Sequence, residues 1–142
     1  MEIYRSVIDI INNKVDGVPY EIGGILGSDD NGIINRIVID LSDSVTAPCR
    51  YSPNVNFLNH AIEEWSNSGI DFVGFFHTHF AGVKTLSNGD KQYIKSIMNA
   101  MPNRVNILYF PIFVLPNREM VCYKAIKHQG HIEIVFEETF IK

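Results

Sequence analysis

Residues 70–79, IDFVGFFHTH, are a run of aromatic and β-branched side chains that ends in two histidines. A short apolar run of this composition favours a largely buried β-strand over a helix. The hydrophobic core must therefore form around this strand, and the residues before and after it indicate which helices and strands surround it.

Apolar residues at helical spacing, together with helix start and stop signals, predict three helices. We expect them at residues 2–14, from Ser52-Pro53 to Gly69 with Ser52 as the N-cap, and from Ser87 to Pro102. Strands are predicted at 21–27 and 33–40, which form a hairpin over SDDNG, at 70–79, and near 104–114, 119–126 and 131–140. Pro111 predicts that strand 104–114 lies at an edge of the sheet or is kinked there. The fold class expected is mixed α/β: a single mixed β-sheet flanked by helices, in one domain that spans residues 1–142.

Composition and charge exclude several classes of function. With 142 residues, of which 46% are hydrophobic and 20% charged, the chain suits one soluble globular domain. A net charge of −4 and the lack of a basic cluster argue against nucleic acid as a partner. No apolar run approaches the length of a membrane span, and the N-terminal residues MEIYRSVIDIINNK lack a signal-peptide core, which predicts a cytoplasmic protein without a membrane partner. Cys49 and Cys122 form no CxxC pair, so we interpret them as buried or incidental thiols.

The stretch HTHFAGVKTLSNGD, residues 77–90, has the chemistry of a metal site. Side chains alternate along a strand, so His77 and His79 project from the same side, with Cα atoms roughly 6.5–7 Å apart. Catalytic zinc typically takes three protein ligands from His, Asp or Glu and leaves its fourth position to water. Asp90, in the first turn of the third predicted helix, is the candidate for the third ligand.

The same residues have a simpler interpretation. Ser87 and Asp90 fit the S/T-x-x-D/E pattern that caps a helix without any metal, and a histidine pair at a strand end can simply face solvent. Other zinc signatures are missing, since the chain has neither HExxH nor the H-x-E and CxxC pair of the nucleobase deaminases. The remaining histidines are expected at the surface: His60, His128 and His131.

A resemblance to a known family favours the metal site. His77, His79, Ser87 and Asp90 match the spacing His-x-His, seven residues, Ser, two residues, Asp, which is the signature of the JAMM metallopeptidases, also called the MPN or JAB domain. Glu21 in EIGGILG fits the Glu-x-x-Gly run that the family places on an early strand. The predicted order of elements resembles the JAB/MPN (cytidine deaminase-like) fold along nearly the whole chain, and TAPCRYSPN is similar to prokaryotic members in particular.

The chain departs from the family pattern just after the second histidine. Phe80 replaces the usual proline, and Phe80-Ala81-Gly82 stands where the RadC-like branch has proline, serine and glycine. The resemblance is therefore to the family's general pattern and not to that branch.

The resemblance implies a zinc-dependent isopeptidase, similar to a deubiquitinase. One Zn²⁺ per chain would be held by His77, His79 and Asp90, with Glu21 as the general base and Ser87 as a hydrogen-bond donor to the oxyanion. The expected substrate is the amide bond after the C-terminal tail of a ubiquitin-like or sulfur-carrier protein, and the edge strand and residues 41–53 are predicted to contact that tail.

Two alternatives stay open at this point. One is a catalytically inactive MPN module that mediates assembly without metal, although such modules usually lack part of the ligand set and here the set is complete. The other is an unrelated α/β binding domain in which the His-x-His pair and the helix cap are incidental.

Overall fold

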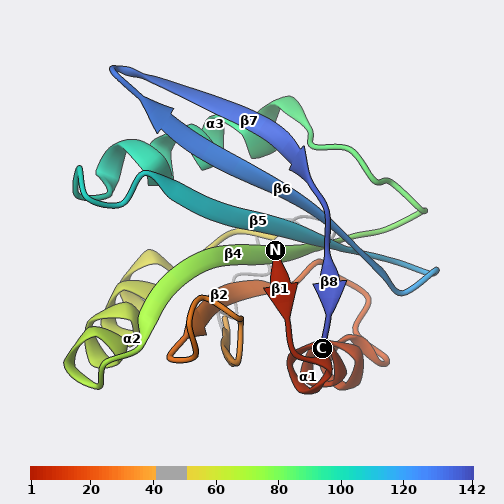
Figure 1. Ribbon diagram of the computed structural model, residues 1–142. Helices are drawn as coiled ribbons and strands as arrows, with labels where there is room; N and C mark the ends of the chain where they lie inside the picture. The colour runs from red at the N-terminus through yellow and green to blue at the C-terminus, as the bar shows by residue number, and fades with distance from the viewer. Residues whose placement is uncertain (41–50) are drawn as a thin grey trace.

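The computed structural model describes residues 1–40 and 51–142, in which a six-stranded sheet carries helices on both faces (Figure 1). The helices are α1 (Arg5–Val15), α2 (Val55–Asn67) and α3 (Asn88–Ala100). The strands of the sheet are β2 (Gly23–Ser28), β3 (Arg36–Ile39), β4 (Asp71–His79), β5 (Ile107–Val114), β6 (Glu119–His128) and β7 (His131–Glu137). Two further short strands, β1 (Glu2–Ile3) and β8 (Phe140–Ile141), pair in parallel.

The order of strands in the sheet is β3-β2-β4-β5-β6-β7, and it is a mixed sheet as expected. β4 and β5 run parallel, whereas the other neighbouring pairs are antiparallel. Parallel neighbours need a long crossover, and α3 supplies it between β4 and β5. The α/β class predicted from the sequence is therefore confirmed, and the crossover places the start of α3 near the end of β4.

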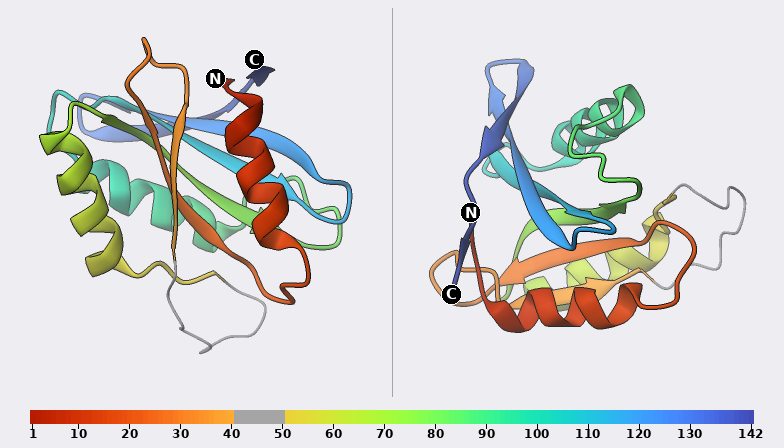
Figure 2. Two further views of the ribbon diagram at one scale, coloured as in Figure 1. Left: turned by 90° about the horizontal axis from the view of Figure 1, so that it is seen from below. Right: turned by 90° about the vertical axis from the view of Figure 1, so that its right-hand side faces the viewer.

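The sheet separates two hydrophobic cores, with α1 on one face and α2 and α3 on the other (Figure 2). Alternation along β4 divides its side chains between them, since Phe76 belongs to the core of α1 and Phe75 to the core of α2 and α3. By the same alternation His77 and His79 face the side of α2 and α3. Thr78, which is fully buried, faces the side of α1.

Of the two alternatives predicted for strand 104–114, an edge position or a kink at Pro111, the edge position is wrong. β5 pairs with β4 on one side and with β6 on the other, so the edges of the described sheet are β3 and β7. The ladder with β4 pairs Tyr109 and Ile112 but skips the two residues between them, one of which is Pro111. Proline has no backbone N–H to donate, but Pro111 lies where β5 has no paired residue in β4. An interior strand can therefore contain this proline.

Two element starts also differ from the predictions. The first helix begins at Arg5 and not at residue 2, because Glu2 and Ile3 pair with β8. The second helix is capped by Asn54 and not by Ser52, since the Asn54 side chain accepts a hydrogen bond from the N–H of Phe57 at 3.1 Å. The segment predicted as one strand at 131–140 is divided between β7 and β8.

Cys122 is a buried free thiol, as expected, and burial raises its pKa to about 12. Cys49 and most of the predicted contact loop 41–53 lie outside the described residues. Among the helices of the described ranges, none has the length and apolar character needed to cross a membrane.

Candidate metal centre

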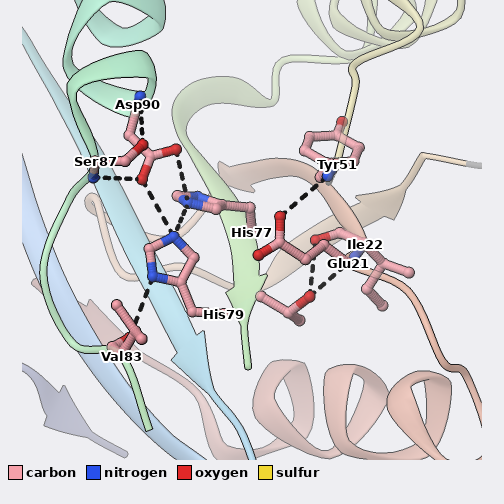
Figure 3. Close-up of polar contacts among 9 residues, drawn as sticks. Glu21, Ile22, Tyr51, His77, His79, Val83, Ser87 and Asp90 are labelled. Carbon is pink, nitrogen blue, oxygen red and sulfur yellow. Dashed lines mark hydrogen bonds and ion pairs between the residues drawn. The ribbon is translucent and has the colours of Figure 1, made fainter. Parts of the chain in front are cut away.

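The end of β4 and the start of α3 bring His77, His79 and Asp90 together (Figure 3). The two histidine Nε2 atoms are 2.8 Å apart. Asp90 reaches both imidazoles, with Oδ2 3.2 Å from Nε2 of His79 and Oδ1 3.5 Å from Nε2 of His77. Three residues predicted from spacing alone therefore form one cluster of donor atoms.

The capping interpretation of Ser87 and Asp90 also holds. Ser87 is the N-cap of α3, and its Oγ accepts a hydrogen bond from the Asp90 N–H at 3.0 Å. In return the Ser87 N–H donates to Asp90 Oδ2 at 2.9 Å, which completes a capping box. The box turns the carboxylate of Asp90 back toward the imidazoles, so capping and clustering support each other. The proton of the Ser87 hydroxyl takes no part in the box and stays available to a further acceptor.

A tight turn after β4 orients His79. Nδ1 of His79 lies 3.1 Å from the carbonyl oxygen of Val83, and the Val83 N–H donates to the carbonyl of Phe80 at 3.2 Å. Ala81 and Gly82 both have positive φ, 55° and 70°, which lets the chain turn back so sharply. Because a carbonyl only accepts, Nδ1 must carry the proton, and in the neutral ring the lone pair of Nε2 then points at the cluster.

The cluster is organised around an ionised carboxylate. Burial works to raise the pKa of Asp90, but hydrogen bonds from His77, His79 and the Ser87 N–H outweigh it and hold that pKa far below its ordinary range. For His79, burial works to lower the pKa, but the hydrogen bond and charge of Asp90 outweigh it and raise the pKa. Asp90 therefore remains an anionic donor at neutral pH.

The donor set fits a zinc ion. Tetrahedral zinc with bonds of about 2.0–2.1 Å needs ligand atoms roughly 3.3 Å apart. The two imidazole Nε2 atoms are 2.8 Å apart, and the carboxylate oxygens of Asp90 lie 3.2 Å (Oδ2 to His79) and 3.5 Å (Oδ1 to His77) from them, which is close to that value. Two imidazoles and one carboxylate are also the ligand types of catalytic zinc, and they leave a fourth position for another group. In the described part of the chain, this is the group of side chains that could hold a metal ion.

Glu21 lies beside this cluster, although it precedes β2 in a segment without regular structure. In the antiparallel pairing of β2 and β4, Gly23 lies opposite His77, and the Thr78 N–H donates to the carbonyl of Ile22 at 2.9 Å. Continuing that register places Glu21 opposite His79, on the same face of the sheet as both histidines. Its Oε1 accepts a hydrogen bond from the Tyr51 N–H at 3.1 Å.

A cavity of about 620 Å³ joins these residues. Its polar lining includes the five residues singled out from the sequence: Glu21, His77, His79, Ser87 and Asp90. Its other walls are mainly aromatic: Tyr51, Phe75, Phe76, Phe80, Tyr93 and Phe110. These aromatic residues were not predicted to belong to the site, and the only signal for Tyr51 was its place in the TAPCRYSPN stretch.

The other histidines lie at the surface, as predicted. His60 pairs with Glu64 along α2, and His128 pairs with Glu133 across the hairpin of β6 and β7. Both contacts are exposed, so they have the character of ordinary surface ion pairs and not of a second site.

Comparisons with known proteins identify the fold of this chain. No protein-family model matches the sequence, and no curated protein matches it. Among solved structures, protein DSY2949 from Desulfitobacterium hafniense matches with a TM-score of 0.65 at 20% identity, over 100% of this chain and 93% of that one. AF2198, a JAB1/MPN domain protein from Archaeoglobus fulgidus, matches with a TM-score of 0.58 at 15% identity, over 100% of this chain and 97% of its own. The chain has the JAB1/MPN fold.

A third solved structure also has this JAB1/MPN fold. It is a JAMM protein described as a metalloprotease-like zinc site in the proteasome and signalosome. The match has a TM-score of 0.54 at 15% identity and covers 100% of this chain and 97% of the other. The likeness shows the fold, while the argument for a metal in this chain rests on its own His77, His79 and Asp90.

Proposed function

We propose that this chain is a zinc-dependent peptidase of the JAMM type, an isopeptidase that hydrolyses the amide bond after the C-terminal tail of a ubiquitin-like or sulfur-carrier protein. The observation that carries the proposal is the convergence of His77, His79 and Asp90 on one point, with Glu21 on the same wall of the cavity. A structural domain has no need to collect three metal-binding side chains and a further carboxylate in one pocket. This convergence also disfavours an inactive scaffold of the same fold.

In this mechanism His77, His79 and Asp90 would hold the zinc. A zinc ion bound there would supply Lewis acidity, which lowers the pKa of water and polarises a carbonyl group. His79 is prepared for this role because Val83 holds the proton on Nδ1. Asp90 is prepared because the Ser87 N–H donates to Oδ2 at 2.9 Å, which favours the ionised carboxylate and directs it toward the imidazoles.

Glu21 acts as the general base. A carboxylate can accept a proton from the attacking water and then deliver it to the leaving amine, provided that it lies within hydrogen-bond reach of both. Ser87 donates a hydrogen bond from its hydroxyl group to the oxyanion that forms when the carbonyl is attacked. Since the capping box uses only the lone pairs of Ser87 Oγ, the same hydroxyl serves α3 and the reaction at once.

The lining of the cavity supports an extended peptide as substrate. Besides the polar residues it contains aromatic side chains, which give a peptide backbone an apolar surface to lie against. A flexible C-terminal tail enters such a site more easily than a folded segment, because its backbone is free to extend.

The test measures zinc and cleavage together. The purified protein is desalted and its zinc content determined by elemental analysis, and we expect one zinc per chain. The same preparation is then incubated with ubiquitin-like and sulfur-carrier proteins that each carry a reporter peptide after the Gly-Gly end, and release of the reporter is followed. Absence of zinc after incubation with the metal would overturn the proposal, and so would zinc binding without cleavage of any fusion.

A further inference from the structure

The carboxylate of Glu21 needs support that its own segment does not provide. Residues 21 and 22 precede β2 and form no regular strand. A glutamate side chain has several rotatable bonds, and a general base works only when it lies within about 2.6–3.2 Å of the proton it takes. Glu21 is nevertheless held by a hydrogen bond of 3.1 Å from the backbone N–H of Tyr51, thirty residues further along the chain.

Tyr51 is itself held at its other end. Its hydroxyl donates to Oδ2 of Asp40 at 2.7 Å, and the backbone N–H of Asn54 donates to the same oxygen at 2.8 Å. Asp40 is 7% exposed, and its own N–H donates to the carbonyl of Gly23 at 2.8 Å. Asp40 thus joins the segment of Tyr51, through its carboxylate, to the first residue of β2, through its backbone N–H, two positions after Glu21.

The ring of Tyr51 lies directly on the backbone of Gly23. A Cβ atom built on Gly23 would lie 2.4 Å from Cε2 of Tyr51, closer than real Cβ contacts come. Gly23 is the residue opposite His77 in the ladder of β2 and β4. The absence of a side chain there lets Tyr51 approach the sheet beside the histidines and bring its N–H to Glu21.

The two oxygens of Glu21 are placed differently as a result. Figure 3 shows Tyr51 and His77 on opposite sides of the Glu21 carboxylate. The bond to Oε1 fixes the orientation of the group and leaves Oε2 on the side of the metal cluster. Burial and the neighbouring Asp40 raise the pKa of the Tyr51 hydroxyl, so it remains a proton donor to Asp40 throughout the neutral range.

We propose that Tyr51 and Asp40 form a clamp that positions Glu21 for proton transfer. Neither residue touches the reacting atoms, so both are positioning residues, and the inference rests on the proposed function for its catalytic consequence. The clamp consists of the Tyr51 N–H on Glu21, the Tyr51 hydroxyl on Asp40, and the ring of Tyr51 on Gly23.

The first readout needs neither metal nor substrate. Amide hydrogen exchange at position 51 is measured by NMR in the metal-free parent and in the Tyr51→Phe, Asp40→Asn and Glu21→Ala variants. We expect exchange at position 51 to become about tenfold faster in each, because the amide either loses its acceptor or is held less firmly. Glu21→Gln should keep the protection, since an amide oxygen still accepts the bond.

The second readout is kinetic and uses the reporter fusions. Tyr51→Phe should lower kcat about tenfold to a hundredfold through misplacement of Glu21, while KM and the zinc affinity stay within about twofold. In the Glu21→Gln background, Tyr51→Phe should cause no further loss, because the group it positions no longer acts as a base. Tyr4→Phe is the matched control, since Tyr4 donates to Asp30 at 2.6 Å on a part of the molecule away from the cavity.

The outcomes separate the clamp from the proposed function. Unchanged exchange at position 51 in all three variants would overturn the clamp, and so would an equal loss of kcat from Tyr51→Phe with and without Glu21. A parent that binds no zinc would overturn the peptidase, yet faster exchange at position 51 in that same protein would still support the clamp.

Discussion

The two sides of the cavity are built in different ways. The histidines and Asp90 come from one continuous stretch of fourteen residues, 77–90, at the end of β4 and the start of α3. Their geometry follows from regular structure: alternation along a strand and a capping box at a helix start. Glu21 comes from an irregular segment. Its carboxylate accepts from the Tyr51 N–H, Tyr51 in turn contacts Asp40, and the neighbouring Ile22 donates its N–H to Thr78.

This difference has a physical consequence. Metal ligands arranged by local structure form whenever the strand and the helix form, because few long-range contacts are involved. The carboxylate of the general base depends instead on the meeting of segments that are distant in sequence. We therefore expect substitutions near Glu21 to impair the reaction while leaving metal binding intact, and substitutions in 77–90 to remove both.

Asp90→Ala should produce the largest effect, the loss of zinc. The variant removes one of three donor groups and should reduce the zinc content from one per chain to nearly none, as measured by elemental analysis after desalting. It also removes half of the capping box, which costs about 1 kcal/mol of stability. Ser87→Ala is the control, because it disrupts the same box and keeps every predicted ligand. Retention of stoichiometric zinc by Asp90→Ala would remove Asp90 from the ligand set.

Glu21→Gln should impair turnover without affecting zinc binding. The amide keeps the shape of the side chain and its bond to the Tyr51 N–H, but it cannot accept the proton of the attacking water. We expect stoichiometric zinc and a fall in kcat of about 10²–10⁴-fold on the reporter fusions. Turnover at the parental rate would exclude Glu21 as the base. The two sides of the cavity would then differ in how they are built but not in their roles in the reaction.

Thr78→Val should have the smallest effect, on stability. Thr78 Oγ1 accepts a hydrogen bond from the Ile22 N–H at 2.9 Å in a fully buried place between the two histidines. Valine has the same shape but leaves that N–H without its partner, which costs about 1–3 kcal/mol. Urea denaturation of the metal-free protein measures this cost, and Thr78→Ser, which keeps the hydroxyl, should recover most of it. An equal loss in both variants would show that packing, and not the hydrogen bond, joins Ile22 to β4.

Local features were predicted well from the sequence. The strand that ends at His79, the N-cap at Ser87 and the approach of Asp90 to the histidines all depend on neighbours within fourteen residues, and the structure contains each of them. Their roles as metal ligands and catalytic groups stay predictions. Two wrong predictions concern the order and pairing of strands: Pro111 lies in an interior strand, and residues 2 and 3 pair with β8 where a helix was expected. One local prediction was also wrong, since Asn54 and not Ser52 caps α2.

The sequence by itself determined the elements and the cluster that one strand and one helix can assemble, because side-chain periodicity and capping act over a few residues. Only the tertiary structure decided that Glu21 lies opposite His79 and that Tyr51 and Asp40 hold it there. Those contacts join segments that the chain brings together only when the sheet forms and both of its faces are covered. No local sequence pattern predicts these contacts, because they depend on which strands become neighbours in the sheet.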